Sequence, residues 1–237
     1  MGEATTQVRY PNMKEGVFLK RPNRFIALIE IDGNVEICHV KNTGRCRELL
    51  KEGARVLVQE CSHPGRKTKF DLISVWKGER LVNMDSQAPN KVFKEWAETS
   101  GYFQGLRLIK AEQKYGNSRF DFYLETKTRK IFVEVKGVTL EEDGVVRFPD
   151  APTERGVKHL NELRACLEDG YEALVVFIVQ MNGVLHFEPN DAMHPEFGAA
   201  LRRLSERGGK VIAVDCLVTE SALEAGDRVE VILGPGL

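Results

Sequence analysis

The sequence predicts a mixed α/β protein with two domains: a small closed β-barrel of the OB-like kind, followed by a domain in which helices cover a mixed sheet. Three observations lead to this expectation. The first 84 residues carry short strand-like segments and no long helical pattern. After about residue 90, helical spacing alternates with continuous apolar runs. A length of 237 residues also leaves room for one or two domains.

The composition excludes several protein classes. With 42% hydrophobic and 29% charged residues, the chain is neither collagen-like, nor a coiled coil, nor mostly disordered. No apolar run approaches the ~18 residues of a membrane span, and the polar start lacks the apolar core of a signal peptide. The five cysteines form no C-x-x-C pair, which favours free buried thiols in a reducing cytoplasm. We therefore expect a cytoplasmic protein without a membrane segment.

The expected barrel consists of four strands and one short helix. The strands are predicted at residues 25–31, 35–40, 54–61 and 71–78. The first two flank Asp32-Gly33-Asn34, which is a hairpin turn signal because Asp-Gly adopts the left-handed backbone of tight turns. A short helix is predicted at 45–52, where Gly53 would end it. This barrel would occupy residues 1–84.

The polar, proline-containing stretch 85–90 marks the predicted boundary, and the second domain would occupy residues 85–237. Its helices are predicted at 91–100, 154–170 and 195–209, with Thr153 opening the second and Pro195 in the first turn of the third. Its strands are predicted at 120–124, 130–140, 173–179, 211–218 and 228–233. The runs 173–179 and 211–218 are apolar throughout, which is typical of strands covered on both faces.

The two halves differ in charge, although the whole chain carries a net charge of −1. Residues 1–84 have 15 Lys and Arg against 10 Asp and Glu, and residues 85–237 have 19 against 25. A basic half is a candidate for binding a polyanion, and chance is the alternative because the excess is mild.

A predicted hairpin with two acidic residues is the most specific candidate for a functional site. If it turns at Lys127-Thr128, the apolar pairs Phe120–Val135, Phe122–Val133 and Leu124–Ile131 all share one face. The other face then places Asp121 opposite Glu134, with Lys136 two residues further on. Two like charges at such a position repel each other, and a hard divalent cation resolves the repulsion.

This pattern predicts a metal site in which Asp121, Glu134 and the carbonyl of Val135 hold Mg²⁺ or Mn²⁺. The metal would activate a water and neutralise charge on a phosphate, and Lys136 would orient that water or stabilise the developing oxyanion. The alternative is that Glu134 and Lys136 merely form part of a solvated strand face.

Candidate nucleic-acid contacts lie on four other segments. They are Arg24, then Asn42, Thr43 and Arg45, then Arg66, Lys67 and Lys69, and finally Arg155 and Lys158. Lys and Arg side chains in such segments can bind the phosphates of a nucleic acid. The alternative interpretations are a helix cap at 42–45 and a solvated loop at 66–69. In the last segment, His159 is either a proton shuttle or a structural hydrogen-bonding group.

Four segments carry a family resemblance: HVKNTGR at 39–45, YGNSRFDF at 115–122, VEVKGVTL at 133–140 and FPDAPTERGVKHL at 148–160. In this order they resemble the sugar fermentation stimulation protein A (SfsA) family over nearly the whole chain. The resemblance implies an N-terminal OB-like domain, a C-terminal domain similar to PD-(D/E)xK nucleases, DNA binding, and a loose association with sugar metabolism. Asp121 matches the first acid of the nuclease motif, and Glu134 and Lys136 match its second half. For the further acid of that motif Glu98 and Glu112 compete, and Glu112 is favoured as a metal ligand.

Together these observations predict a DNA-binding protein with a Mg²⁺-dependent site that cleaves phosphodiester bonds. The catalytic residues would be Asp121, Glu134, Lys136 and His159. The first alternative is a catalytically silent DNA-binding regulator linked to sugar metabolism, because a fold can keep binding after losing catalysis. A sugar-binding regulator is a third hypothesis, which no residue pattern supports.

Overall fold

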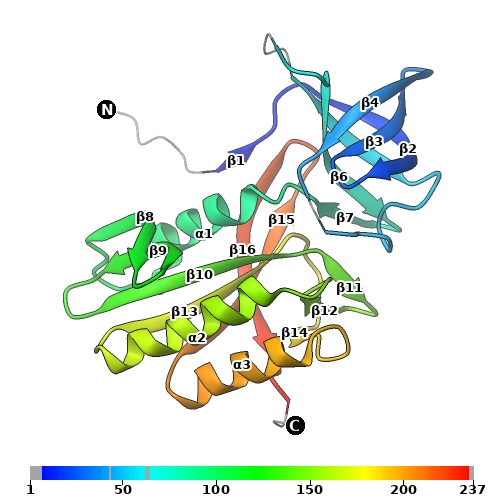
Figure 1. Ribbon diagram of the computed structural model, residues 1–237. Helices are drawn as coiled ribbons and strands as arrows, with labels where there is room; N and C mark the ends of the chain where they lie inside the picture. The colour runs from blue at the N-terminus through cyan, green and yellow to red at the C-terminus, as the bar shows by residue number, and fades with distance from the viewer. Residues whose placement is uncertain (1–6, 43, 62–64, 235–237) are drawn as a thin grey trace, which may run out of the picture.

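The computed structural model describes residues 7–42, 44–61 and 65–234, and it has two parts, a barrel and a sheet domain (Figure 1). The barrel strands are β2 (Met13–Asn23), β3 (Ile26–Ile31), β4 (Asn34–Val40), β5 (Arg55–Glu60), β6 (Phe70–Lys77) and β7 (Arg80–Asn83). They follow the order β4-β3-β2-β5-β6-β7, and a parallel pairing between β4 and β6 closes the barrel. The predicted OB-like barrel is thus confirmed.

Three details of the barrel differ from the sequence analysis, and one of them is the short strand β7, which was not predicted. The longest strand, β2, was not predicted, because its side chains are mostly exposed and polar and show no apolar alternation. The helix predicted at 45–52 is wrong, since the described residues form turns there. Cys46 has a left-handed backbone (φ 47°), and Arg21 donates to the carbonyl oxygens of Gly44 and Arg45. A left-handed residue and carbonyls taken by a side chain are incompatible with the start of a helix.

The sheet domain contains three helices and most of the remaining strands. They are α1 (Ala88–Thr99), β8 (Leu108–Tyr115), β9 (Ser118–Glu125), β10 (Lys130–Val138), β11 (Leu140–Glu142), β12 (Val145–Phe148), α2 (Glu154–Glu168), β13 (Glu172–Val179), β14 (His186–Pro189), α3 (Pro195–Glu206), β15 (Lys210–Val218) and β16 (Ala222–Val231). The strand order is β11-β12-β14-β16-β15-β13-β10-β9-β8, with β10, β13 and β15 parallel neighbours and β9–β10 an antiparallel hairpin. The predicted mixed sheet is confirmed.

Helices cover this sheet on both faces (Figure 1). Val92, Phe93 and Trp96 of α1 pack with Val133 and Val176 from one face of the sheet. On the opposite face, α2 and α3 pack against the other side of the same strands, in a second cluster that continues into the barrel core. The continuous apolar strands β10, β13 and β15 therefore form the middle layer of an α/β/α sandwich.

A short first strand, β1 (Val8–Arg9), pairs antiparallel with β16 in the large sheet. Within the range 1–84 predicted for the barrel, β1 therefore lies in the large sheet, and the barrel strands begin with β2. Burial of Val8 in the α1 cluster, together with this backbone pairing, explains why β1 stays with that sheet.

The stretch 85–90, which we predicted as a polar boundary, connects β7 to α1 and is not a loose linker. Asp85 is buried, and its carboxylate accepts hydrogen bonds from the Tyr10 hydroxyl (3.2 Å) and the backbone N–H of Gln87 (3.0 Å). The side-chain amide of Gln180 donates to Asn83 Oδ1 (2.9 Å) and to the Asp85 carbonyl oxygen (3.0 Å). Buried polar groups paired in this way fix the two parts relative to each other.

Among the described residues, no helix combines the length and apolarity that crossing a membrane requires.

Candidate functional site

A cavity of about 390 Å³ opens where the β9–β10 hairpin meets the N-terminal ends of α1 and α2. It is lined by Ser86, Gln87, Pro89, Asn90, Arg119, Asp121, Glu134, Val135, Lys136, Gly137, Arg155 and His159. The four residues predicted to be catalytic thus converge on one opening. Three cationic side chains, Arg119, Lys136 and Arg155, lie around the two acids. This arrangement suits a negatively charged ligand that binds next to a metal cation held by the acids.

The hairpin places the two acids in the predicted register over most of its length. Leu124 pairs with Ile131 and Phe122 with Val133, as the apolar pattern predicted. Beyond that point, Asp121 does not pair through its backbone with Glu134. Its Oδ2 instead accepts a hydrogen bond from the backbone N–H of Val135 at 2.8 Å.

This contact changes the strand alternation at Asp121. The prediction that Phe120 shares a face with Val135 is wrong, because Phe120 belongs to the α2 cluster and lies 5.5 Å, centre to centre, from the ring of Phe132. Its ring also lies 6.1 Å from that of His159. The irregularity turns the carboxylate of Asp121 into the cavity, while the Phe120 ring packs near His159 in the α2 cluster.

Glu134 is the most enclosed group of the site, with 2% of its surface exposed. Its Oε1 lies 2.5 Å from Lys136 Nζ and 2.6 Å from His159 Nδ1. Arg155 Nε donates to His159 Nε2 (3.4 Å), which leaves Nδ1–H as the donor to Glu134. Burial alone would raise the pKa of Glu134, but the His159 hydrogen bond and the Lys136 ammonium outweigh it and hold that pKa below its ordinary value.

Asp121 is shifted in the opposite direction. Burial and the nearby charge of Glu134 raise the pKa of Asp121, and the hydrogen bonds from Val135 and Asn90 offset this only in part. Asn90 Nδ2 donates to Asp121 Oδ1 at 3.1 Å. Two neighbouring carboxyls with pKa values moved apart are typical of a functional site.

The donor set fits a hard divalent cation. Glu134 Oε2 is buried and has no hydrogen-bond partner, although a buried carboxylate oxygen normally has one. A cation between this oxygen and Asp121 would satisfy it and would relieve the repulsion between the two acids. Among the described residues no group of three or more His, Cys, Asp or Glu side chains converges as a ready metal site. The ion that fits is therefore one that keeps several waters, as Mg²⁺ does with one or two carboxylates.

The two candidates for the further acid do not reach the cavity. Glu112, which was favoured, lies on β8 with an exposed side chain 3.2 Å from Arg119. Its backbone is left-handed (φ 52°), and the pairing of Glu112 with Asp121 is missing from an otherwise continuous β8–β9 register, so the side chain points to solvent. Glu98 lies on α1, 3.9 Å from Lys94. The assignment of Glu112 as a metal ligand is therefore wrong.

The predicted nucleic-acid contacts divide into several places. Arg155 lines the acidic cavity, whereas Lys158 points outward and lies 4.0 Å from Glu162. Arg24 and Arg45 line a second pocket, of about 260 Å³, on the barrel. Asn42 accepts the Gly44 N–H with its side chain (2.8 Å), while Thr43 lies outside the described residues.

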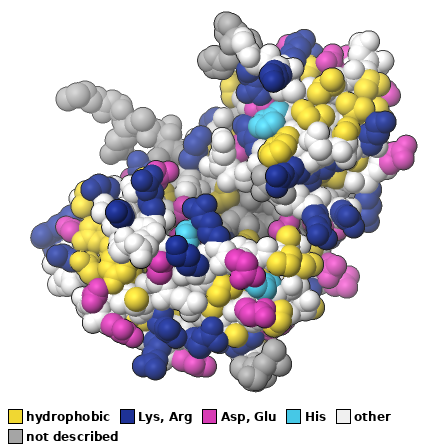
Figure 2. All heavy atoms as spheres, in the orientation of Figure 1, with side chains coloured by type: hydrophobic (Ala, Val, Ile, Leu, Met, Phe, Trp, Pro, Cys, Tyr) yellow, Lys and Arg dark blue, Asp and Glu magenta, His cyan; other side chains and the backbone are white. Residues whose placement is uncertain are grey.

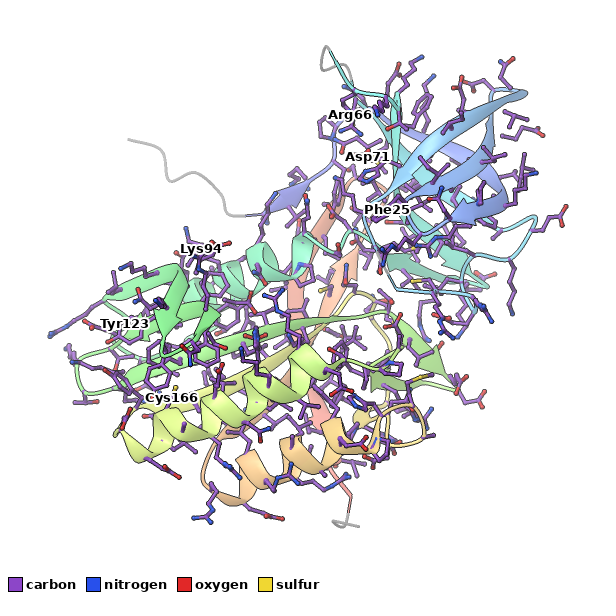
Figure 3. All side chains as sticks on the ribbon, viewed as in Figure 1. Phe25, Arg66, Asp71, Lys94, Tyr123 and Cys166 are labelled. Carbon is purple, nitrogen blue, oxygen red and sulfur yellow. The ribbon has the colours of Figure 1, made fainter. Side chains whose placement is uncertain are left out.

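The basic loop of the barrel is less available than the sequence suggested. Arg66 is paired with the buried Asp71, and Figure 3 labels both at the barrel. Lys69 lies 3.0 Å from Glu60, which leaves Lys67 exposed between two paired cations. The charges of Arg66 and Lys69 are thus largely compensated within the barrel.

Sequence reasoning missed the contribution of α1. Gln87 and Asn90 line the cavity from the N-terminal turn of that helix, and Asn90 holds Asp121. They belong to the stretch that we interpreted as a boundary. The signal was Pro89, because a proline in a first helical turn marks a helix N-terminus, where polar side chains and N–H groups meet anions.

Comparisons with known proteins agree with this architecture. A family profile described as the sugar fermentation stimulation protein RE domain matches residues 87–222, and one described as the SfsA N-terminal OB domain matches residues 19–84. A sugar fermentation stimulation protein homolog from Desulfitobacterium hafniense (strain DSM 10664 / DCB-2) is 62% identical, over 97% of this chain and 100% of the relative. One from Clostridium beijerinckii is 58% identical, over 95% and 100%. The solved structure of Pyrococcus furiosus SfsA in complex with Ca²⁺ is 28% identical, with a TM-score of 0.86 over 95% of this chain and 98% of that one.

Proposed function

The chain belongs to the sugar fermentation stimulation protein (SfsA) family, and from the geometry of its acidic cavity we propose that it binds DNA and cleaves phosphodiester bonds with the help of a divalent cation. One observation carries the proposal. The buried carboxylate of Glu134 and the half-buried carboxylate of Asp121 meet at an opening flanked by three cations, and their pKa values are shifted in opposite directions. One oxygen of Glu134 has no hydrogen-bond partner among the described protein groups.

Asp121, Glu134 and the carbonyl oxygen of Val135 would hold Mg²⁺ or Mn²⁺. When bound, such an ion supplies an activated water and neutralises charge that builds up on the phosphate. His159 and Lys136 fix Glu134 Oε1, so that Oε2 is the oxygen directed to the ion. Asn90 and the Val135 N–H fix both oxygens of Asp121 in the same way. The carboxylates are therefore positioned before any ligand arrives.

The cations of the cavity have a separate task. Lys136 lies beside the carboxylates and would stabilise the negative charge of the transition state. Arg119 and Arg155 stand at the rim, where their guanidinium groups can hold the phosphates on either side of the scissile one. His159 lines the cavity, but its Nδ1 is bonded to Glu134 and its Nε2 to Arg155, which supports a positioning role over the proton shuttle of the sequence analysis.

A polyanion can approach this cavity from the barrel side. Figure 2 shows Lys and Arg side chains on both sides of the hollow between the barrel and the sheet domain. The basic excess of residues 1–84 supports the same direction of approach. The Ca²⁺ complex of the similar Pyrococcus furiosus protein supports a divalent cation as the ligand of this fold.

The experiment incubates the purified protein with plasmid DNA and with a single-stranded oligonucleotide, in Mg²⁺, Mn²⁺ or EDTA. We expect cleavage that requires the cation and that Asp121→Asn and Glu134→Gln abolish. Glu98→Gln is the matched control, because this acid lies on α1 near Lys94 and does not line the cavity, so its loss should leave the rate unchanged. Cleavage that survives in both cavity variants would show that the activity comes from another site or a contaminant.

A catalytically silent DNA-binding regulator is the second candidate. The observation in its favour is that only two acidic side chains line the cavity, with no third His, Cys, Asp or Glu ligand among the described residues beyond the His159 that is already bonded to Glu134. This candidate predicts DNA binding that falls steeply with salt, but neither cleavage nor a calorimetric signal for Mn²⁺.

A further inference from the structure

We propose that the barrel binds single-stranded nucleic acid, with one base stacked on Phe25 and the adjoining phosphates held by the arginines beside it. Cleavage of the bound strand rests on the proposed function, and single-stranded nucleic acid would be the substrate class of that activity. The stacking site itself can be tested without any cleavage.

Phe25 is an aromatic ring open to solvent on a rigid support. It occupies the turn between β2 and β3 and is 47% exposed. Among the described residues, every other Phe, Tyr and Trp side chain is buried or half-buried. The Phe25 N–H donates to Asn23 Oδ1 (2.8 Å), and its carbonyl oxygen accepts the N–H of Val40 (2.7 Å). A ring held in this way loses little entropy when a flat ligand covers it.

One guanidinium group, that of Arg24, lies beside this ring, and three others line the adjoining pocket. The guanidinium carbon of Arg24 lies 5.0 Å from the Phe25 ring centre, and the pocket of about 260 Å³ next to it is lined by Arg21, Arg24, Arg45 and Arg47. Within the described residues, no carboxylate forms an ion pair with Arg24, Arg45 or Arg47. This contrasts with Arg66 and Lys69, which have acidic partners. Uncompensated guanidinium groups next to an exposed ring complement the phosphates and the base of a nucleotide.

Arg21 ties the two loops of this pocket together. Its guanidinium donates to the carbonyl oxygens of Arg24, Asn42, Gly44 and Arg45, at 2.7–3.0 Å. The loop that carries Phe25 and the loop that carries Arg45 therefore have a fixed spacing. Such fixed spacing is what a binding site needs and what a solvated surface does not require.

The site lies next to the acidic cavity. Asn42 lines a small cleft together with Gly137, and Gly137 also lines the cavity. Figure 3 shows Phe25 on the part of the barrel that borders the sheet domain. A strand that leaves the ring of Phe25 can therefore pass Arg45, Gly44 and Asn42 on its way to the acids.

The ring distinguishes a single strand from a duplex. In a duplex both faces of an internal base are covered by its neighbours, so Phe25 could meet only phosphates there. In a single strand a base face is free to stack, and base–aromatic stacking accounts for roughly 5- to 150-fold in affinity per base.

The experiment measures fluorescence anisotropy of a labelled oligothymidylate and of a duplex of equal length, with Ca²⁺ or EDTA in place of Mg²⁺. We expect Phe25→Ala to weaken single-strand binding by roughly 5- to 150-fold and duplex binding by less than about twofold. Val35→Ala is the matched control, because Val35 is 60% exposed on the same barrel, at the opposite end of the β3–β4 hairpin. Its single-strand affinity should match that of the parent protein.

Phe25→Trp gives a second readout that does not depend on affinity changes. Its indole emission should be quenched when the oligothymidylate binds and should not change with the duplex. Equal losses for both substrates in Phe25→Ala, or no quenching in Phe25→Trp under saturating oligothymidylate, would overturn the stacking site. If stacking holds but Asp121→Asn leaves cleavage unchanged, the proposed nuclease site fails and the strand-binding site stands. If Asp121→Asn abolishes cleavage but the Phe25 variants show no stacking, the strand-binding site fails and the proposed nuclease site stands.

Discussion

His159 gives the sharpest test of how the acidic cavity is held together. Its ring is buried and its Nδ1 lies 2.6 Å from Glu134 Oε1, while Lys136 is the other donor to that oxygen. In His159→Ala the buried carboxylate keeps one donor and loses the other. We expect the protein to fold with lower stability and with a weakened hold on Glu134.

The magnitude follows from the type of contact that is lost. A hydrogen bond to a charged group contributes about 1.5–3 kcal/mol. For a chain of this size each kcal/mol corresponds to about 2–4 °C in Tm, so the expected fall is about 3–12 °C at neutral pH. Because His159 helps to hold the pKa of Glu134 below its ordinary value of 4.5, this stabilisation is present above pH 4.5. It is lost as the pH falls through the folded-state pKa of Glu134.

The assay is thermal unfolding of the parent protein, His159→Ala and His159→Asn at pH 7 and near pH 4. Asn carries an amide N–H near the position of Nδ1, so His159→Asn should recover part of the lost Tm. A fall below about 1 °C in His159→Ala, or a fall that is as large near pH 4 as at pH 7, would refute the contact with ionised Glu134.

Three further predictions follow from other contacts. Asp121→Asn should raise the Tm at neutral pH, because burial and Glu134 raise the pKa of Asp121 and make its ionised form unfavourable in the folded state. The same variant should weaken Mn²⁺ binding. Thermal unfolding measures the first effect and calorimetry the second, and a lower Tm would contradict the repulsion between the two carboxylates. Lys77, the Gly144 N–H and Arg80 outweigh the effect of burial and lower the pKa of Glu141 to about 2. Glu141 should therefore contribute stability that is lost as the pH falls from about 4.5 to about 2. Glu141→Gln should remove that part of the acid transition. Thr153→Ala should lower stability by about 1 kcal/mol without changing DNA affinity, because the Thr153 hydroxyl caps α2 by accepting the N–H three residues later (3.1 Å); an unchanged melting curve would argue against the cap.

Much of the fold was accessible from local patterns. The apolar runs of β13 and β15 and the alternation on the hairpin predicted the parallel half and the register up to Phe122 and Val133. These patterns succeed because burial on one or both faces leaves a direct periodicity in the sequence. Strand β2 and the edge strand β8 were missed, because their mostly exposed side chains carry no such periodicity.

The candidate site was predictable where its residues are close in sequence. Asp121, Glu134 and Lys136 lie on one hairpin, so alternation and register could bring them together. The position of Asn90, the outward turn of Glu112 and the pairing of Arg66 with Asp71 depend on long-range contacts and on a single left-handed residue. No local pattern encodes such contacts, which is why the third ligand was misassigned and the role of α1 was overlooked.

The most direct test of the central claim is an anomalous difference map from crystals grown with Mn²⁺. We predict a single strong peak per chain between Asp121 and Glu134 Oε2, with the carbonyl oxygen of Val135 in its coordination sphere. A map without a peak there, at a Mn²⁺ concentration that saturates any calorimetric signal, would contradict the account of these carboxylates as a cation site.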